Sequence, residues 1–428
     1  MERTYIKDVT PGVRRVQGFV ENFRNKRTMA FIVVKDITGK LQITIEKEKH
    51  PEFLEMLDKL TIHSVVTFEG EVVASEYVKM GGKEMYPDFM RVESYADALP
   101  IKDDSDIDVR MDYRWIDLRR EKNQLMYQMQ TTLTNAMREF LVEKNFVEIH
   151  TPKLIAAASE SGSDVFEVKY FDGLAYLAQS PQFYKQMAMA SGLERIFETG
   201  PVFRAEKSYT NKHATEFSGF DLEFSYIDSF EDVMHLEEEL LAYAIAKVKE
   251  AHGEKLKELF GMELDVPALP FPRMKLSDVY AELEARYGYK VPDELKGDLT
   301  TEAERMTKQL CRDMFDHEFL FITDYDAKER AFYHMRDEQG VPQGYDLIWR
   351  GVEITTGAQR EHRYDVLKAQ AEEKGLADDV KFYLDFFKYG CPPHGGFGLG
   401  IDRLTMLFLG LSIKEAEFLF RGPNRLTP

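Results

Sequence analysis

The chain has 428 residues, enough for two or three domains and for a sizeable apolar core, which excludes a peptide hormone and a small disulfide-stapled scaffold. With 56 Lys and Arg against 75 Asp and Glu, the formal net charge is −19, so the whole molecule is not attracted to nucleic acid or to an anionic membrane. Residues 1–100 hold 15 basic and 16 acidic side chains, so nearly all of the negative excess lies in the rest of the chain. Any contact with a polyanion must therefore use a local basic patch.

The cysteine content and the apolar runs indicate the compartment. Only two cysteines occur, Cys311 and Cys391, which fits a reducing compartment and predicts no structural zinc site. The first residues lack the apolar run of a signal peptide, and no stretch approaches the roughly 18 apolar residues that a membrane helix needs. We therefore expect a soluble, cytoplasmic protein without a membrane partner.

Residues 14–93 alternate short β-branched and aromatic runs with turn signals such as Thr38-Gly39 and Gly81-Gly82. Five such runs predict five strands and a small barrel. The OB-fold is a five-stranded barrel that commonly binds oligonucleotides on an exposed face, but the pattern alone also fits another small β domain. We place this first domain at residues 1–100.

The sequence pattern changes after residue 100. Residues 101–125 come after a proline and include an acidic cluster, so we expect a linker or hinge there. The next segment predicts a helix, because its apolar residues recur at steps of three and four and would form one buried stripe. These residues are Met126, Met129, Leu133, Met137, Phe140 and Leu141. Residues 126–428 mix strand-like and helical runs without regular β-α-β alternation, which predicts an α+β domain with a mainly antiparallel sheet flanked by helices.

Four segments of this larger domain place charged or aromatic residues where a packed core would not need them. They are QSPQFYKQ, where a helix would begin, VFRAE, where a strand would end, EFSGFDLEF, which alternates along one strand face, and DLIWRGVEITTGAQR. Each alone is compatible with a surface ion pair or a solvated strand face. Together they supply an arginine for phosphate, an aromatic ring for a base and carboxylates for Mg²⁺, as an ATP site without a P-loop requires. The residues in question are Gln182, Lys185, Arg204, Glu206, Phe217, Gly219, Asp221, Glu223, Asp346, Glu353 and Arg360.

Through these segments the sequence resembles the class II aminoacyl-tRNA synthetases, subclass IIb, over essentially its whole length. The three class motifs correspond to the segment that ends EIHTPKL at Pro152, to FRAEKSYTNKHATEFSGFDLE, and to GFGLGIDRL with Arg403. Within the class, QSPQFYKQ and RGVEITTGAQREH resemble aspartyl-tRNA synthetases of the archaeal and eukaryotic type. The resemblance implies an N-terminal OB-fold and two reactions. L-aspartate and ATP would give aspartyl-adenylate and pyrophosphate, and the aspartate would then pass to the 3′ end of tRNA(Asp).

The resemblance also implies an ATP site. Arg204 would hold the α-phosphate and the substrate carboxylate, and Glu206 would contact the adenine amino group. Phe217 and Arg403 would lie on the two faces of the adenine ring. The implied ATP-binding residues are Arg204, Glu206, Lys212, His213, Phe217, Glu353, Gly400 and Arg403, of which Arg204, Glu353 and Arg403 would be catalytic.

Mg²⁺ is the implied cofactor. Glu353, helped by Thr356 and Asp346, would coordinate the ion, so that pyrophosphate leaves with its charge neutralised. Positioning and electrostatics would then drive the reaction without a covalent enzyme intermediate.

Amino-acid choice separates the related families, because aspartate has two carboxylates and one ammonium group. Lys185 and Arg360 match the family positions that bind the side-chain carboxylate, and acidic or amide residues surround the ammonium group. An asparagine pocket would leave such a pair of cations poorly compensated, and a lysine pocket would need the opposite sign. The implied aspartate-binding residues are Glu160, Gln182, Lys185, Arg204, Asp221, Thr356 and Arg360.

In this family the barrel reads the tRNA anticodon. Phe31 and Gln42 match positions that stack on and hydrogen-bond the central uridine, and Arg24 would contact phosphate. The chain departs from the family pattern at Phe19 and carries Glu21 where selective members often have tryptophan. These departures favour relaxed selectivity, so that tRNA(Asn) would be charged as well as tRNA(Asp).

Alternatives remain open at this point: a tRNA-binding paralogue that has lost catalysis, an asparaginyl-tRNA synthetase, and an aspartate-activating enzyme that passes the adenylate to ammonia. Arg204, Glu353 and Arg403 are all present, which argues against the first, and the barrel argues against the last. The spacing of the motifs leaves room only for a small insertion, at about residues 255–335. The resemblance also implies a homodimer with the Pro152 segment at the interface.

Overall fold

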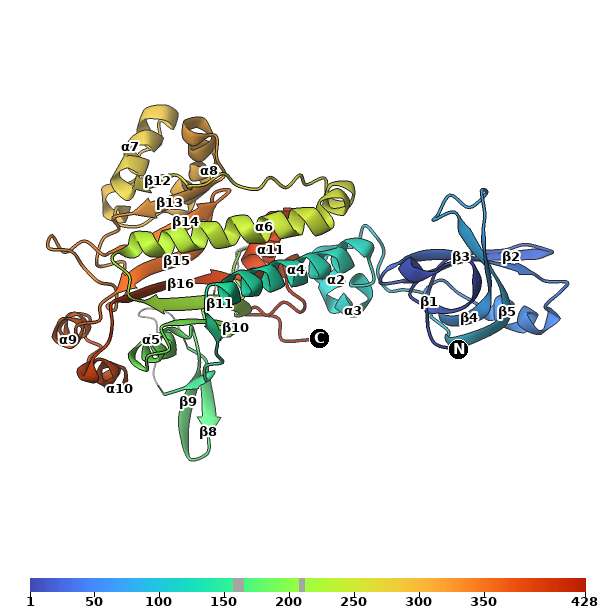
Figure 1. Cartoon of the computed structure of the whole chain (residues 1–428), viewed down its shortest axis with the longest axis horizontal. Helices are drawn as coiled ribbons and strands as arrows, with labels where there is room; N and C mark the ends of the chain where they lie inside the picture. The colour runs from blue at the N-terminus through green and yellow to red at the C-terminus, as the bar shows by residue number, and fades with distance from the viewer. Residues whose placement is uncertain (157–164, 208–211) are drawn as a thin grey trace. The chain divides into compact units, whose positions relative to one another are not determined.

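The computed structural model describes residues 1–156, 165–207 and 212–428. They form two compact units, Met1–Asp106 and Ile107–Pro428 (Figure 1). Glu160, one of the expected aspartate-binding residues, lies outside the described residues. Within the described ranges, no helix has both the length and the apolarity needed to cross a membrane.

The N-terminal unit is a closed five-stranded barrel. Its strands are β1 (Gly12–Asn25), β2 (Met29–Asp36), β3 (Gly39–Glu46), β4 (Val65–Ala74) and β5 (Lys83–Ser94), in the spatial order β1-β2-β3-β5-β4. The short helix α1 (Leu54–Lys59) lies between β3 and β4 in the chain. Alternate residues of β2 are buried, with Ala30, Ile32 and Val34 inside the barrel, as period-two patterning requires. The predicted five strands and the OB-fold are confirmed.

The segment that follows the barrel is helical where the sequence predicted a linker or hinge. Residues 107–125 contain α2 (Ile107–Asp112), α3 (Arg114–Asp117) and the start of α4 (Glu121–Glu143), and they belong to the larger unit. Arg114 is fully buried and pairs with Asp117 at 2.5 Å. It also donates to the carbonyl oxygens of Glu415 and Glu417, about 300 residues away in the sequence. These distant partners explain why local composition did not reveal that the segment is packed.

The larger unit is built on an eight-stranded sheet in the order β12-β13-β14-β15-β16-β11-β10-β6. All neighbouring pairs are antiparallel except β6–β10 and β12–β13, so the predicted mainly antiparallel α+β domain is confirmed. The strands are β6 (Val147–Glu148), β10 (Arg195–Phe203), β11 (Glu216–Ser225), β12 (Arg273–Lys275), β13 (Phe319–Thr323), β14 (Gly344–Trp349), β15 (Val352–Arg360) and β16 (His394–Gly400). A separate three-stranded sheet holds β7 (Leu154–Ile155), β9 (Gly173–Leu177) and β8 (Glu167–Tyr170).

Two long helices cover one face of the sheet. In Figure 1, α4 and α6 (Phe230–Phe260) run side by side across it. The apolar stripe predicted for α4 is buried, because Met126, Met129, Leu133 and Met137 join the main core together with residues of the central strands. The remaining helices are α5 (Gln182–Ala190), α7 (Leu276–Tyr287), α8 (Thr301–Phe315), α9 (Tyr364–Glu373), α10 (Lys381–Leu384), α11 (Ile401–Leu409) and α12 (Ile413–Ala416).

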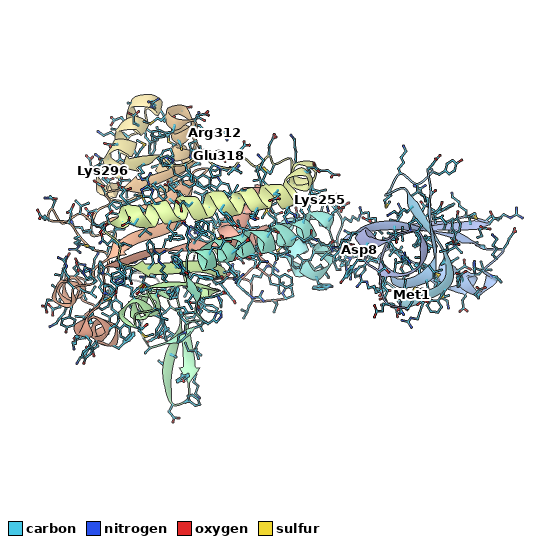
Figure 2. All side chains as sticks on the ribbon, in the orientation of Figure 1. Met1, Asp8, Lys255, Lys296, Arg312 and Glu318 are labelled. Atoms are coloured by element: carbon cyan, nitrogen blue, oxygen red, sulfur yellow. The ribbon has the colours of Figure 1, made fainter. Side chains whose placement is uncertain are left out.

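Residues 255–335, where a small insertion was expected, contain α7 and α8 together with β12 and β13, which extend the sheet at one edge. Side chains of these elements form a core cluster of their own around Val279, Leu283 and Leu310. On the outside, Arg312 at the end of α8 pairs with Glu318 at 2.7 Å (Figure 2).

Candidate active site

A cavity of about 380 Å³ opens in the larger unit, lined by the ends of β10 and α5 and by the central strands β11, β15 and β16. Most of the predicted site residues meet there although they come from distant parts of the chain. The predicted residues that line it are Gln182, Arg204, Glu206, Lys212, His213, Phe217, Gly219, Asp221, Glu353, Thr356, Arg360, Gly400 and Arg403.

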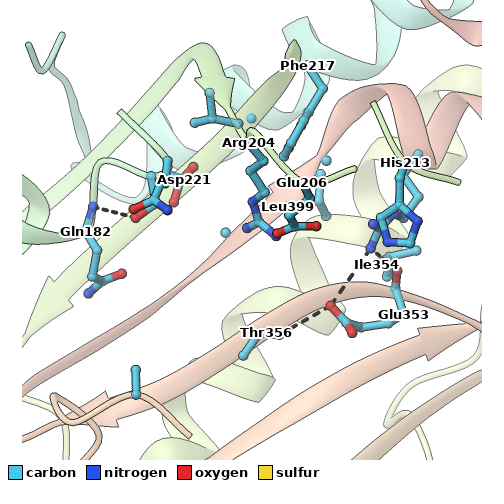
Figure 3. A pocket seen from close by; sticks show the side chains of 18 of the residues that line it. Gln182, Arg204, Glu206, His213, Phe217, Asp221, Glu353, Ile354, Thr356 and Leu399 are labelled. Carbon is cyan, nitrogen blue, oxygen red and sulfur yellow. Dashed lines mark hydrogen bonds and ion pairs between the residues drawn. The ribbon is translucent and has the colours of Figure 1, made fainter. Parts of the chain in front are cut away.

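Figure 3 shows the cavity from close by, with Gln182 and Asp221 on one side, Arg204 and Phe217 in the middle, and His213 and Glu353 on the other side. We call the first side the Asp221 end (Gln182, Lys185, Asp221, Glu223 and Arg360). We call the other side the Glu353 end (Lys212, His213, Glu353 and Arg403).

Lys185 lies beneath the Asp221 end rather than on its surface. The first turn of α5 carries it into the protein, where its side chain is fully buried and is not among the lining residues. Its Nζ atom is 2.9 Å from Asp221 Oδ1 and 3.5 Å from Glu223 Oε2, and it donates to the carbonyl oxygen of Phe397 at 3.3 Å. Asp221 and Glu223 face the same way because they are two residues apart on β11, as the sequence predicted.

Arg360, at the end of β15, completes the Asp221 end. Its Nε atom donates to Glu223 Oε1 at 2.9 Å, and its Nη2 atom donates to the carbonyl oxygen of Gly396 at 2.8 Å. Burial alone would raise the pKa of the Glu223 carboxyl, but the charges of Arg360 and Lys185 hold that pKa below its usual value. Glu223 is therefore ionised, and two cations and two carboxylates are fixed in a dry environment.

His334 is a residue of this end that the sequence did not reveal. It lines the cavity, is buried, and its Nε2 atom accepts a hydrogen bond from Arg360 Nη1 at 3.4 Å. Burial and the neighbouring charges of Arg360 and Arg330 keep the pKa of His334 well below its usual value, so the ring stays neutral. A single histidine between Tyr333 and Met335 carries no periodic signal, and its partner Arg360 is brought close only by the fold.

Arg204 lies between the two ends, just after β10. The strand ends at Phe203, so Arg204 and Glu206 belong to the following loop rather than to the strand that the sequence predicted. The chain leaves the strand here because pairing with β11 stops at Phe203, although Arg204 N still donates to the carbonyl oxygen of Thr215. The guanidinium group lies 5.6 Å from the centre of the Phe217 ring, and its buried Nε atom has no hydrogen-bond partner in the described part of the chain.

The Glu353 end is more open. Arg403, in the first turn of α11, donates from Nη1 to the carbonyl oxygen of Glu353 at 2.8 Å, and the same nitrogen is 3.9 Å from Glu353 Oε1. The side chain of Glu353 is 41% exposed. Burial lowers the pKa of His213, and the charges of Arg403 and Lys212 lower it further, so this ring is neutral at pH 7.

Asp346, an expected metal ligand, is engaged with another side chain. Arg330 grips it through both nitrogens, with Nη1–Oδ1 and Nη2–Oδ2 distances of 2.9 and 2.6 Å. Thr356 donates its hydroxyl to Asp346 Oδ1 at 2.9 Å and lies 3.4 Å from Glu353 Oε1. Asp346 is not among the cavity-lining residues, whereas Thr356 and Glu353 are. Arg330 was missed because its partner lies 16 residues further along the chain, on another element.

The oxygens of Glu353 and Thr356 are of the kind that binds Mg²⁺. The ion prefers hard oxygen donors and is bound through one or two carboxylates together with substrate phosphates. The protein atoms around the Glu353 carboxyl and the nearby charge of Asp346 raise its pKa, so a cation placed against it would relieve carboxylate repulsion. The Thr356 hydroxyl lies within hydrogen-bond distance of both Asp346 and Glu353, and its oxygen also carries lone pairs that can accept a cation. Glu353 and Thr356 therefore fit the ion.

Comparison with known proteins decides the family. The model for tRNA synthetases class II (D, K and N) matches residues 106–420, and the model for an OB-fold nucleic acid binding domain matches residues 15–93. The chain belongs to the class II tRNA synthetases. This family activates its amino acids with ATP, and the cavity described above is the candidate active site of its catalytic domain.

Individual relatives of this synthetase are named for different tRNA specificities. The aspartate–tRNA(Asp/Asn) ligase of Methanopyrus kandleri is 43% identical over all of both chains. The aspartate–tRNA(Asp) ligase of Pyrococcus furiosus is 38% identical over 97% of this chain and 96% of the relative. Among solved structures, asparaginyl-tRNA synthetase from Pyrococcus horikoshii complexed with asparaginyl-adenylate has a TM-score of 0.92 and 32% identity, covering all of both chains.

The synthetase's barrel groups the expected anticodon residues on one outer surface. Arg24 of β1 is paired in register with Phe31 of β2, and Phe31 is paired with Thr44 of β3. Gln42 lies two residues from Thr44 on the same face, and its Nε2 atom donates to Thr44 Oγ1 at 3.2 Å and to Glu84 Oε2 at 3.3 Å. Sequence reasoning missed Glu84, which reaches Gln42 from β5 through the closure of the barrel.

Proposed function

We propose that this synthetase activates L-aspartate with ATP and transfers it to the 3′ end of tRNA(Asp). The observation that supports the proposal is the buried set of charges at the Asp221 end. Lys185 and Arg360 are held by Asp221 and Glu223 at 2.9 Å each, so the cations are already in place before a ligand arrives. Arg204 adds one further positive charge beside them. The net charge of these five groups is +1, which complements the −1 of free aspartate.

Asparagine is the competing substrate, since asparaginyl-tRNA synthetase from Pyrococcus horikoshii has a very similar fold. Its neutral side-chain amide would leave one positive charge of this largely buried pocket without compensation. The amide would also place an NH₂ donor among the donors of Lys185 and Arg360, which have no lone pairs to accept it. The side-chain chemistry of this chain therefore favours the acid over the amide.

In the proposed activation step, Arg204 holds the α-phosphate and the substrate carboxylate, and its unpartnered Nε atom is available for this contact. Phe217 stacks on the adenine ring, and Arg403 covers the opposite face. Gln182 and Asp221 contact the ammonium group at the cavity wall. Mg²⁺, held by Glu353 and Thr356, would neutralise the charge of the departing pyrophosphate.

The tRNA partner is bound through the barrel, where Phe31, Gln42 and Arg24 face the anticodon. A second candidate activity is charging of tRNA(Asn) in addition to tRNA(Asp). One ground for it is that the Methanopyrus kandleri relative is named as a ligase for both tRNA(Asp) and tRNA(Asn). The other is Glu21, which pairs with Lys40 at 3.0 Å on the barrel instead of presenting a bulky ring.

A homodimer in the cytoplasm completes the proposal. Apolar side chains are exposed around the Pro152 segment, with exposed fractions of 59% for Val142, 49% for Val147 and 47% for Leu154. Burying them against a second copy would remove apolar surface from water. Light scattering coupled to size-exclusion chromatography tests this, and a monomer at micromolar concentration would contradict it.

The experiment for the proposed function is charging of unmodified tRNA(Asp) and tRNA(Asn) transcripts with labelled aspartate. We expect aspartate to be attached to tRNA(Asp) in an ATP-dependent reaction. Failure to charge either transcript would contradict the proposal. A tRNA(Asp) to tRNA(Asn) ratio of kcat/KM above about 10³, or roughly 4 kcal/mol, would remove the second candidate activity.

A further inference from the structure

Glu304, on α8, contacts two residues of the Glu353 end. Lys212 donates from Nζ to Glu304 Oε1 at 2.9 Å and to Oε2 at 2.6 Å. The backbone N–H of Glu353 donates to the same Oε1 atom at 2.9 Å. Glu304 is buried, with 8% of its surface exposed, whereas the side chain of Lys212 is 25% exposed. One carboxylate from α8 therefore binds both the loop after β10 and the start of β15.

The start of α8 fixes the position of this carboxylate. Thr300 caps the helix by accepting from the backbone N–H of Ala303 at 3.1 Å, and Glu304 N donates to the carbonyl oxygen of Thr300 at 2.8 Å. Glu304 thus belongs to a rigid first turn, and Lys212 is the longer and more mobile partner.

The ion pair has a direct consequence for a nucleotide. A lysine has three N–H donors, and two of those of Lys212 are used by Glu304. A terminal phosphate that accepts hydrogen bonds from Lys212 therefore competes with Glu304 for its N–H donors.

We propose that Glu304 is a positioning residue that holds Lys212 while the nucleotide is absent and competes with the terminal phosphate of ATP for it. This rests on the proposed function, because Lys212 is one of the ATP-binding residues that the resemblance implies and we place it at the terminal phosphate. The competition weakens ATP binding, and after the reaction Glu304 recaptures Lys212 and promotes release of pyrophosphate.

Glu304→Gln is the decisive variant, because the amide oxygen still accepts from Glu353 N while the negative charge is gone. In isothermal titration of the full chain with Mg²⁺–ATP, we expect the Kd to fall by about threefold to tenfold. The KM for aspartate should not change. The matched control is Glu302→Gln on the same helix, where the exposed Glu302 pairs with Arg305 at 2.6 Å, and its Kd should equal that of the unmodified chain.

Tighter binding is a result that simple damage to the fold would not give. An unchanged or raised Kd for Glu304→Gln would overturn the inference. In a Lys212→Met background the effect of Glu304→Gln should vanish, since the two residues act through one contact. Should Lys212→Met alone leave the Kd unchanged, the inference is overturned, whereas aspartate charging in the same protein would still support the proposed function. Loss of charging with the Kd effects intact would instead contradict the proposed function alone.

Discussion

The two ends of the cavity are built differently. At the Asp221 end, Lys185 and Glu223 are fully buried, and Arg360 is 2% exposed. At the Glu353 end, the side chains of Glu353, Lys212 and Arg403 are 41%, 25% and 24% exposed. The first end presents a fixed charge pattern in a dry site, while the second presents long side chains that can exchange partners in contact with water.

This difference teaches how one cavity can be selective and still adaptable. A buried charge that loses its partner is costly, so a wrong ligand at the Asp221 end is rejected by the electrostatics of the pocket itself. Exposed pairs are weak and solvent-screened, so the Glu353 end can accept a highly charged triphosphate and release pyrophosphate afterwards. We infer that selectivity is set at one end and turnover at the other.

The largest effect is expected from Lys185→Met, because this variant removes a fully buried cation from the Asp221 end. Removing the cation leaves Asp221 and Glu223 underpaired, so we expect kcat/KM for aspartate to fall by about 10³-fold and stability to fall by about 3–5 kcal/mol. Pyrophosphate exchange and urea denaturation measure the two effects. Mg²⁺–ATP affinity should survive, and Lys169→Met on the exposed face of β8 is the control. An unaltered KM for aspartate would show that Lys185 does not set the charge of this end.

Asp346→Asn tests whether Asp346 supports cation binding at the Glu353 end. The amide keeps a contact with Thr356 but no longer balances Arg330, whose positive charge then opposes a cation at Glu353. We expect the Mg²⁺ concentration for half-maximal exchange to rise by about tenfold or more, as for other residues behind a metal ligand. Direct Mn²⁺ binding followed by electron paramagnetic resonance should weaken in parallel. Asp365→Asn, on an exposed helix turn, serves as the reference, and equal Mg²⁺ requirements for both variants would refute this role.

We expect aspartate activation in the cavity to be independent of tRNA binding by the barrel. Phe31→Ala removes a stacking surface worth about 1–3 kcal/mol per base, so the KM for tRNA should rise by about fivefold to a hundredfold. Exchange of pyrophosphate without tRNA should remain at the level of the unmodified chain. A loss of exchange would mean that activation and tRNA binding are not separable in this way.

The smallest effect concerns Glu237, which lies in the core behind both ends. Its Oε2 atom accepts from the Tyr345 hydroxyl at 2.6 Å, and burial raises the pKa of Glu237 to about 8. Between the ordinary carboxyl pKa and about 8, the folded chain binds a proton that the unfolded chain has lost. The protonated Glu237 carboxyl therefore stabilises the folded chain at low pH, and this stabilisation is lost as the pH rises from the ordinary carboxyl pKa to about 8.

Glu237→Gln should remove that loss because the amide does not titrate. We subtract the Tm of the unmodified chain from the Tm of the variant at each pH. This difference should be about 3 °C larger at pH 8.5 than at pH 6. Parallel Tm profiles for the two proteins across this range would be inconsistent with a buried, protonated carboxyl.

Much of this cavity could be predicted from local spacing. Period-two alternation correctly placed Asp221 and Glu223 on one face of β11, and the first turn of a helix placed Gln182 beside Lys185. The barrel followed from the same alternation because its strands have one buried face. These predictions succeeded where a side chain's direction depends only on its own strand or helix.

Other residues could not be found in this way. Arg330 acts through Asp346, His334 through Arg360, and Glu304 through Lys212, which is 92 residues away in the sequence. Each pair is created when two distant elements pack, so neither partner has a local pattern that would single it out.

The central claim is that buried cations at the Asp221 end select the acid over the amide. It is tested most directly by ATP–pyrophosphate exchange with aspartate or asparagine as the only amino acid, at equal Mg²⁺ and without tRNA. We expect kcat/KM to favour aspartate by about 10³-fold or more, because an uncompensated buried charge penalises asparagine. Equal exchange with the two amino acids, or faster exchange with asparagine, would contradict the account.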